Sequence, residues 1–344
     1  LTNGSTVSRL SDEDLPPPNG VVVINGYAVY TIADGRILAS AIDNAGNIDP
    51  LSLAREDTNP DQNVGIAKRG QDVVVFGTKS VGFWHDVGGD PFPLEPISSI
   101  DSVGCLSRSS IVEADQTLFW VASDGTVRRL AGYAAQVVSS DDIAEAIAST
   151  TDKANIQALA WVDRGNTMIE FSCADWTYVL NLATGFWHEQ KSYEQSRWRA
   201  AWSMNLAGRH IVGDYASANL YELDPNTYTD AGDALVSEVH MGIDRFPRGF
   251  TLDTVEVQTF AGVGLNNPSA HLSDPEMMIA VSRDQGRTWP VERRAKLGKI
   301  GEYGTRTYAH GFGTCLSSGR VRLSISAAVR RGISGVSIDA EGLK

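Results

Sequence analysis

Short apolar segments separated by turn residues recur along the first two thirds of the chain. The first, residues 21–39, contains the dipeptides Asn25-Gly26 and Asp34-Gly35. Asparagine or aspartate followed by glycine between β-forming residues favours a tight hairpin, because the turn needs residues that adopt positive φ. Further segments of this kind, each with a turn and a large aromatic residue or leucine near its end, cover residues 72–84, 117–130, 167–187 and 209–223.

These segments begin about 40 to 50 residues apart, which is the repeat length of four-stranded propeller blades. A single blade cannot bury both of its faces, so blades must stack on their neighbours around an axis. We therefore predict a β-propeller over residues 21–233, which need not be complete in this chain, after a leading segment or linker over residues 1–20. A β-sandwich gives similar strand spacing and remains the alternative for this region.

One predicted helix interrupts the strands. Ser139 and Ser140 precede Asp141 and Asp142, and apolar residues follow at helical spacing over residues 143–148. A hydroxyl N-cap and acidic residues in the first turn are typical of a helix start. We expect this short helix to pack against the rim of one blade.

The pattern changes after about Gly232. Apolar and polar residues now alternate in well-separated segments, with a long loop and a basic stretch between them. We predict a separate β-sandwich-like module over residues 234–344, so that the whole chain is all-β. A final pair of propeller strands that closes the ring is the alternative. The alternating segments are residues 251–260, 277–281 and 320–326, the loop is residues 262–275, and the basic stretch is residues 293–299.

The charge balance narrows the possible functions. The 344 residues carry a formal net charge of −13, and 42% of them are hydrophobic, which is typical of a soluble globular protein. A strongly acidic surface repels phosphate backbones. We therefore expect no sequence-independent binding of nucleic acid through a broad basic face.

The three cysteines, Cys105, Cys173 and Cys315, are far apart and odd in number. This indicates buried thiols in a reducing compartment, and argues against a disulfide framework or a zinc site. No apolar run reaches the roughly 20 residues that span a bilayer, so we predict no membrane insertion. We also predict no metal and no cofactor. The chain begins at Leu1, and we expect an upstream segment to have been removed or left out.

One short motif matches the S-x-D-x-G-x-T-W pattern called the Asp box, which is common in sialidase-type propellers. Its residues are Ser282, Asp284, Gly286, Thr288 and Trp289. We expect Asp284 to cap backbone N–H groups, Gly286 to supply positive φ, and Trp289 to pack beneath the hairpin. The box is a structural element in sialidases, which also need an arginine cluster and a Tyr/Glu nucleophile pair. We predict no catalytic residues and no enzymatic activity, with a sialidase-like glycosidase as a remote alternative.

Two histidines, His85 and His188, each follow a Phe-Trp pair and precede an acidic residue. In a functional interpretation, such pairs of a histidine and an acidic residue could bind a metal or act as bases. In a structural interpretation, the two histidines lie at equivalent ends of outer blade strands. Neighbours on one strand point to opposite faces, so His85 and Asp86 cannot easily converge. We favour the structural interpretation.

Several segments, in this order and spacing, resemble phage packaged-DNA stabilisation proteins. These are the tail hub, or nozzle, proteins of short-tailed phages and related prophages. The likeness extends from about residue 64 to residue 343. The segments are residues 77–84, Phe92-Pro93, and residues 117–133, 184–189, 211–223, 226–230, 282–289 and 297–306.

The resemblance implies a structural virion protein of the phage tail, assembled in the host bacterial cytoplasm. Six copies would form a ring below the portal and adaptor, extend the DNA channel, retain the packaged DNA, receive a tail needle or plug, and carry tailspikes or tail fibres. Double-stranded DNA would pass transiently, without sequence-specific binding, and we hypothesise a negatively charged channel lining that lets DNA slide. A glycan- or peptide-binding propeller is the alternative.

A ring of identical subunits requires two different complementary patches on each subunit. Long loops with charged or small residues carry contacts more often than blade cores do. We therefore place candidate assembly contacts in residues 262–275 and 296–306, with Lys299 and Arg306 as the residues to test.

Overall fold

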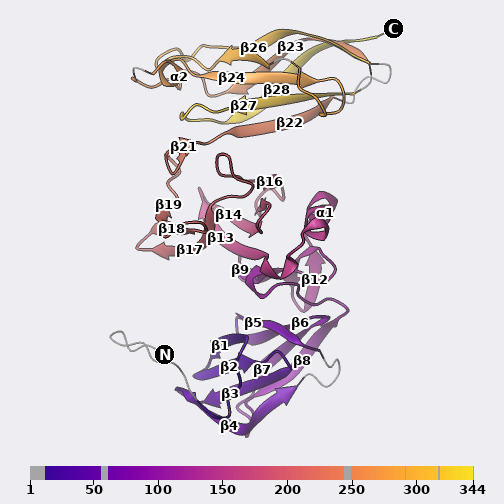
Figure 1. Cartoon of the computed structure of the whole chain (residues 1–344), viewed down its shortest axis with the longest axis vertical. Coiled ribbons are helices and arrows are strands. Elements are labelled where there is room, and N and C mark those ends of the chain that lie inside the picture. The colour runs from indigo at the N-terminus through magenta and orange to yellow at the C-terminus, as the bar shows by residue number, and fades with distance from the viewer. Residues whose placement is uncertain are drawn as a thin grey trace. The chain divides into compact units, whose positions relative to one another are not determined.

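The computed structural model of the chain describes residues 12–55, 61–243, 249–267, 269–290, 292–316 and 318–343. The chain forms two compact units. Unit one comprises residues 1–191 and 195–222, and unit two comprises residues 192–194 and 223–344. Strands dominate both units (Figure 1).

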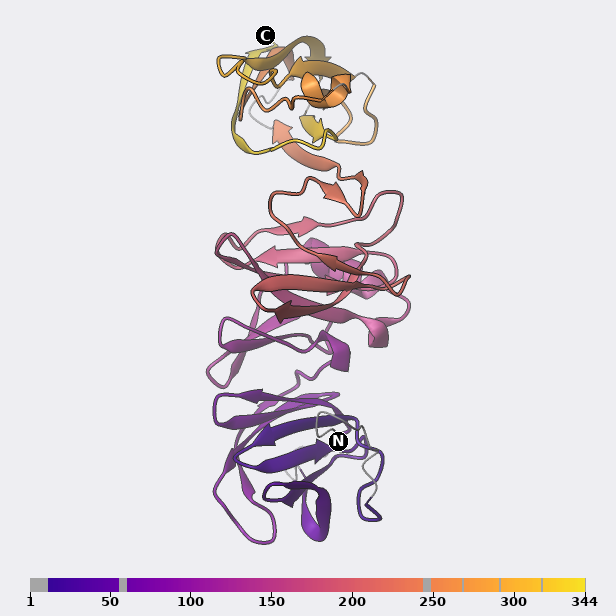
Figure 2. The ribbon, with the colours of Figure 1, turned by 90° about the vertical axis from the view of Figure 1, so that its left-hand side faces the viewer.

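The described part of unit one contains five antiparallel sheets, which we call blades one to five (Figure 2). Within each blade, every strand pairs with its neighbour in sequence. Blades one to four have four strands and blade five has three. The strands are β1 (Gly20–Ile24), β2 (Tyr27–Thr31), β3 (Arg36–Ala41) and β4 (Asn44–Arg55); β5 (Asn63–Arg69), β6 (Asp72–Gly77), β7 (Ser80–Asp86) and β8 (Leu94–Asp101); β9 (Val112–Ala114), β10 (Thr117–Val121), β11 (Val127–Ala131) and β12 (Ala134–Val137); β13 (Gln157–Asp163), β14 (Asn166–Ser172), β15 (Thr177–Asn181) and β16 (Trp187–Glu189); and β17 (Ala200–Leu206), β18 (Arg209–Asp214) and β19 (Leu220–Glu222).

The first hairpin turn has the geometry that its sequence predicts. Asn25 and Gly26 both have positive φ, at 48° and 89°, and they join Ile24 directly to its partner Tyr27. Two consecutive residues with positive φ match the right-handed twist of the flanking strands. The dipeptide therefore sets the register of β1 on β2.

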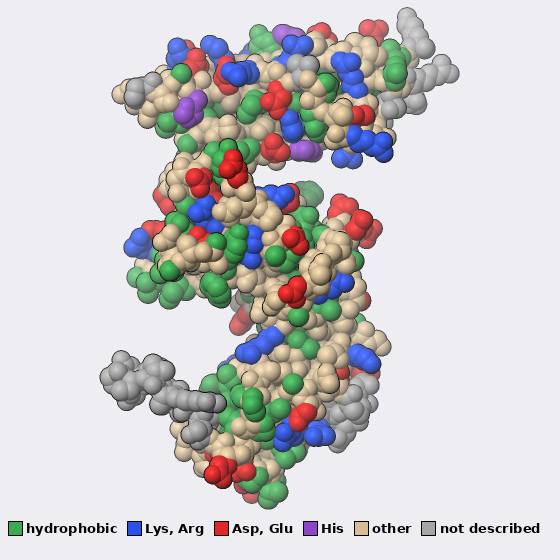
Figure 3. Space-filling view, viewed as in Figure 1, with side chains coloured by type: hydrophobic (Ala, Val, Ile, Leu, Met, Phe, Trp, Pro, Cys, Tyr) green, Lys and Arg blue, Asp and Glu red, His purple; other side chains and the backbone are tan. Residues whose placement is uncertain are grey.

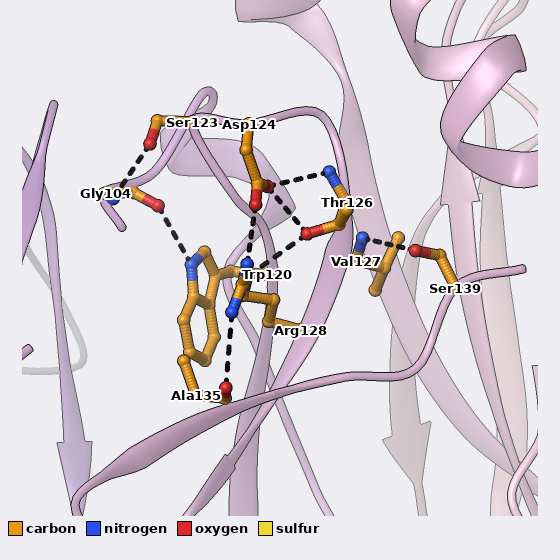
Figure 4. Close-up of polar contacts among 9 residues, drawn as sticks. All are labelled: Gly104, Trp120, Ser123, Asp124, Thr126, Val127, Arg128, Ala135 and Ser139. Carbon is orange, nitrogen blue, oxygen red and sulfur yellow. Dashed lines mark hydrogen bonds and ion pairs between the residues drawn. The ribbon is translucent and has the colours of Figure 1, made fainter. Parts of the chain in front are cut away.

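The turn of blade three depends on aspartate side-chain chemistry (Figure 4). Gly125 has positive φ, at 82°, whereas Asp124 does not. The Asp124 carboxylate accepts hydrogen bonds from the Thr126 N–H at 3.0 Å and from its hydroxyl at 2.6 Å, and it pairs with Arg128 at 2.6 Å. A side-chain cap of this kind holds the turn in place of a second left-handed residue.

Blades two and three approach closely at Gly104. A Cβ at this position would lie 2.2 Å from the carbonyl carbon of Thr78, so only glycine fits. The Gly104 carbonyl accepts a hydrogen bond from the buried Trp120 indole at 3.1 Å. Beside it, Phe76 of blade two lies edge-on to the Trp120 ring, with centroids 5.3 Å apart.

Apolar side chains between neighbouring blades form the cores of unit one. Ile24 and Trp84 belong to the cluster between blades one and two. Trp161 of blade four contacts Trp198 at the start of blade five, with ring centroids 5.4 Å apart. Each blade therefore buries a face against the next blade in sequence, as the predicted propeller requires.

Helix α1 (Asp141–Ser149) begins after Ser140, where the sequence predicts it, although the Ser140 hydroxyl makes no capping hydrogen bond. Its apolar residues Ile143 and Ile147 are buried in the cluster that joins blades three and four. The helix therefore contributes to a core between blades, beyond the rim contact that we expected. Two short 3-10 helices, η1 (Arg108–Ser110) and η2 (Lys153–Asn155), lie in the connections nearby.

The described part of unit two contains two larger sheets with the strand orders β22-β27-β24-β25 and β26-β23-β28. Their apolar faces share one core cluster, which includes Phe250, Ile279 and Leu323. This is the predicted sandwich, and its strands pair with one another and not with a blade. The elements are β20 (Thr229–Asp230), β21 (Asp233–Ala234), β22 (Ser237–Ile243), β23 (Phe250–Thr259), α2 (Ala270–Ser273), β24 (Glu276–Ser282), β25 (Glu292–Lys296), β26 (Thr307–Cys315), β27 (Gly319–Ile325) and β28 (Ile333–Gly342).

Candidate assembly surfaces

The structure brings together the two segments in which the sequence analysis places assembly contacts. The Gly262 N–H donates to the Leu297 carbonyl at 2.8 Å, and the Gly264 N–H donates to the Gly298 carbonyl at 3.1 Å. Gly298 has φ of 89°, which favours glycine where the backbones approach. Residues 262–275 and 296–306 therefore form one surface on unit two.

Lys299 and Arg306 are both exposed on this surface and both take part in contacts within the unit. The Lys299 ammonium lies 3.9 Å from an Asp274 oxygen. The Arg306 guanidinium forms two hydrogen bonds with Glu256, at 2.8 and 2.6 Å, and these hold the pKa of Glu256 below its usual value. Exposed ion pairs of this kind contribute little to stability because solvent screens them, so either cation could contact a partner without loss of the fold.

An apolar groove of about 640 Å³ lies beside these two segments, and residues within 226–229, 260–261 and 328–330 complete its lining. Phe260, Leu265, Ile300 and Tyr303 line it and are all substantially exposed. The Arg330 guanidinium stacks over the Phe260 ring at 4.3 Å. Exposed apolar patches rimmed by charge mark interaction sites. The predicted segments contain Leu265, Ile300 and Tyr303, although the two residues predicted for testing, Lys299 and Arg306, are both charged.

A second apolar surface, missed by the sequence analysis, covers one face of blade five (Figure 3). Trp202, Met204 and Leu206 alternate along β17 and are each more than half exposed, as is Leu220 on β19. Gly213 lies between Trp202 and Leu220 in the sheet, and the absence of a side chain there lets those two residues converge. We call this surface the blade-five face.

Blade one also has exposed apolar residues on its face away from blade two, although Leu15 and Ile48 pack over Tyr30 and Leu38 on that face. Val21, Val23 and Leu53 are exposed. The register of β1 to β4 places them on the same face as Tyr30 and Leu38, and blade two packs against the opposite face. The described array of blades thus has exposed apolar residues at both of its ends.

The Asp-box residues form a compact turn between β24 and β25 in unit two. The Ser282 hydroxyl accepts the Gly286 N–H at 2.8 Å and donates to Asp284 at 2.6 Å, while Asp284 accepts the Thr288 N–H at 2.8 Å. Hydrogen bonds from Ser282 and Thr288 lower the pKa of Asp284 to about 2. The carboxylate is therefore engaged in holding the turn.

Trp289, the last residue of the box, lies against the two neighbouring strands. Its ring is edge-on to His240 of β22, with centroids 5.3 Å apart, and the Arg322 guanidinium of β27 stacks on it at 4.8 Å. The motif therefore connects the turn to the outer face of the sheet.

The structure pairs His85 with Asp72 and not with its sequence neighbour Asp86. The His85 Nδ1 lies 3.0 Å from Asp72 Oδ1. The Tyr133 hydroxyl donates to the other Asp72 oxygen at 3.2 Å, and Arg69 lies 3.3 Å from it. This network links blade two to blade three.

Glu170 is fully buried on β14, and neither of its carboxylate oxygens has a hydrogen-bond partner among the described residues. Burial raises the pKa of Glu170 to about 8, and the nearby Ser172 hydroxyl and, to a smaller extent, the Arg197 charge oppose this shift only in part. Arg197 itself is buried, donating to the Ser172 hydroxyl and the Ala200 carbonyl at 3.1 Å each and stacking on Tyr215.

Arg331 holds the start of unit two to the sandwich. Its Nη1 lies within hydrogen-bond distance of three acceptors and its Nη2 of two, so that one N–H of Nη1 is shared, and burial lowers its pKa. The acceptors are the carbonyls of Leu235, Ile325, Tyr228 and Ala327, at 2.6, 3.1, 3.3 and 2.9 Å, and the Ser237 hydroxyl at 2.9 Å.

Charge is divided unevenly along the sequence. Residues 1–233 carry 31 acidic and 15 basic side chains, whereas residues 234–344 carry 11 acidic and 14 basic ones. The acidity of the chain therefore belongs to the blades, and the C-terminal module is slightly basic.

The three cysteines are buried and free, and burial raises the pKa of Cys105 to about 12. Within the described ranges, no group of three or more His, Cys, Asp or Glu side chains is placed to hold a metal. Among the described helices, none has the length and apolarity to cross a membrane. Blades followed by a sandwich, with apolar surfaces on both units, define a two-part all-β protein suited to assembly.

Comparison with known families identifies that class more closely. The family model described as "Bacteriophage P22 Gp10, beta-propeller" matches residues 1–228, and the one described as "Bacteriophage P22 Gp10, beta-sandwich" matches residues 244–341. The chain therefore belongs to the bacteriophage P22 Gp10 family of phage DNA stabilisation proteins. The matches confirm the predicted fold class and the resemblance, and they make the chain a structural protein of the phage particle.

Solved structures give only distant similarity, and no curated protein matches the chain. The computationally designed Ika8 protein has a TM-score of 0.35 and 15% identity over 59% of this chain and 60% of its own. The chain thus spans about 60% of the length of that design. An exo-β-1,3-galactanase from Phanerochaete chrysosporium has a TM-score of 0.32 and 11% identity, over 93% of this chain and 95% of its own. Neither likeness bears on function.

Proposed function

We propose that this chain is the tail hub, or nozzle, of a short-tailed phage and that it works by holding its partners in place and not by catalysis. The observation that carries this proposal is the family match across both units. In this proposal, six copies form a ring below the portal and adaptor. The ring extends the DNA channel, retains the packaged DNA, receives a needle or plug, and carries tailspikes or tail fibres.

The exposed surfaces support assembly. A closed ring uses two different patches on each subunit, and apolar patches on a monomer mark such contacts. The candidates are the blade-five face, the exposed residues Val21, Val23 and Leu53 of blade one, and the groove of unit two.

The division of charge supports a role beside DNA. With 31 acidic and 15 basic side chains in residues 1–233, a channel lined by the blades would repel the phosphate backbone and let DNA slide. We propose that the blades line the channel. A ring whose lumen is basic would contradict this part of the proposal.

Reversing the charge of Lys299 and Arg306 together is expected to weaken assembly without unfolding the subunit. Both side chains are exposed, and their pairs with Asp274 and Glu256 contribute little to stability. We expect Lys299→Glu/Arg306→Glu to reduce co-sedimentation with a portal–adaptor complex about tenfold, with the unfolding midpoint of the free subunit nearly unchanged.

A matched control is Arg287→Glu/Arg294→Glu, which makes the same charge change at two exposed arginines of unit two outside the candidate segments. Its co-sedimentation should equal that of the parent chain. If both double variants lose co-sedimentation equally, the loss results from the change in net charge and not from the position of the residues. Normal assembly of Lys299→Glu/Arg306→Glu, or melting of its subunit, would remove these residues from the interface.

A further inference from the structure

A polar hollow of about 380 Å³ lies beside the Asp-box turn of unit two. It lies where β22 and β27 pair, with Gly242 opposite Arg320 and Ile243 opposite Gly319. Gln285, within the Asp-box turn, contributes to its wall. The lining residues are His240, Met241, Gly242, Gln285, Ser318, Gly319 and Arg320.

Among the residues that the structure describes, the side chains lining this hollow offer hydrogen-bond donors and no carboxylate. Arg320, Gln285 and Ser318 each carry N–H or O–H groups. The Ser318 hydroxyl is shielded from solvent and has no hydrogen-bond partner among the described residues. Buried donors without acceptors are costly, and an acceptor that enters the hollow would satisfy this one.

Arg320 differs from the other cations of the same sheet. Arg322 pairs with Glu292, and Arg294 pairs with Glu276. Within the described part of the chain, the Arg320 guanidinium has no ion pair or hydrogen bond. It therefore leaves a planar fork of donors available to a ligand.

The Asp-box turn positions this arginine. Gly286 has φ of 95°, and a Cβ on it would lie 3.2 Å from Arg320 Cδ, so the glycine leaves room for the arginine stem to lie over the turn. The hydrogen bonds of Ser282 and Asp284 hold that turn. Gln285 has φ of 62° and stands at its tip. A motif that forms a rigid turn thus also forms one wall of the hollow.

The surrounding charge favours an anion. Residues 234–344 carry 14 basic and 11 acidic side chains. Glu238 lies 3.5 Å from the His240 Nε2 without lining the hollow, and the Asp284 carboxylate of the turn is engaged by Ser282 and Thr288. An arginine without an acidic partner favours a negatively charged ligand over a positively charged one.

We propose that this hollow binds the oxyanion group of a small ligand, a carboxylate or a phosphate, with Arg320 as its main contact and Ser318 and Gln285 as further donors. The volume is at the lower end for ligand sites and leaves room for one sugar ring that bears the anion. The site is separate from the assembly surfaces proposed above, so each can fail without the other.

Calorimetric titration at fixed low ionic strength tests the site with three probes: glucuronate, inorganic phosphate and neutral glucose. We expect saturable binding of at least one anion and none of glucose. Arg320→Ala should weaken that binding tenfold or more, because a charge-assisted fork is lost. Ser318→Ala should weaken it severalfold, while Arg294→Ala, an exposed arginine on the same sheet, should leave it unchanged.

The relative affinities of the two anions distinguish the two possible classes of ligand. Tighter binding of glucuronate would assign the site to a sugar acid, and tighter binding of phosphate would assign it to a phosphorylated ligand. The inference is overturned if neither anion saturates, or if Arg294→Ala weakens binding as much as Arg320→Ala does. Because Arg320 is exposed, we expect Arg320→Ala to remain folded. Hydrogen exchange of β27 checks the fold of each variant.

Discussion

Replacing Glu170 with glutamine is expected to make unit one more stable at alkaline pH and to abolish a loss of stability that the parent chain shows between about pH 4.5 and pH 8. The folded pKa of Glu170 is about 8, against an ordinary value of 4.5. Between these values the native chain keeps a proton that the unfolded chain has released. Stability therefore falls as pH rises through this window, by about 1.4 kcal/mol per pH unit.

Above pH 8 the native chain holds a buried ionised carboxylate on β14, which the Ser172 hydroxyl and the Arg197 charge stabilise only in part. The neutral amide of Glu170→Gln has no such charge to bury. We expect the variant to exceed the parent in free energy of unfolding by several kcal/mol at pH 9 and to resemble it near pH 4.5. Urea unfolding from pH 4.5 to 9, followed by tryptophan fluorescence, measures this.

Glu113→Gln provides the control, because Glu113 is an exposed carboxylate of blade three. It should preserve the pH dependence of the parent. If Glu170→Gln and Glu113→Gln show the same slope, Glu170 is not the group that links stability to pH.

Replacing Arg331 with methionine is expected to destabilise unit two by roughly 3 to 5 kcal/mol. The change leaves four carbonyls without the donors that they have in the native structure, and each unsatisfied buried acceptor costs about 1 to 3 kcal/mol, less where water reaches it. Arg331→Lys should recover only part of the loss, because a single ammonium cannot reproduce contacts that two separate nitrogens make.

Hydrogen exchange of β22 and β27, read by mass spectrometry, locates the effect. Exchange in these strands should accelerate in Arg331→Met, since Arg331 binds the carbonyls next to both. Arg330→Met is the matched control, an exposed neighbour that stacks on Phe260. Equal protection in the two variants would show that the hydrogen bonds of Arg331 are dispensable.

Much of the fold follows from local sequence chemistry. Asn25-Gly26 and Asp124-Gly125 mark hairpins because their side chains favour the turns that form there. Other hairpin turns contain neither of these dipeptides. Arg164-Gly165 and Ala207-Gly208 close turns with two positive φ values each, although arginine and alanine rarely adopt them. The predicted segment of this blade begins at Arg209, after the second of these turns, and therefore leaves out strand β17.

The candidate sites depend on contacts that a single sequence does not reveal. Alternation along β17 predicts a strand with two unlike faces, but not that the face with Trp202 stays uncovered. Glu170 is a charged residue within a predicted strand, and a single sequence does not indicate that its side chain is fully buried. Arg306 meets Glu256 across 50 positions of sequence. Ion pairs between residues so far apart in sequence depend on the strand arrangement of the folded sandwich.

The most direct test of a tail hub is the mass of the protein in solution, alone and with a portal–adaptor complex. The account predicts that subunits assemble on that complex as a six-fold ring. A subunit that stays monomeric and ignores the complex would contradict the account and favour a propeller that binds a glycan or a peptide.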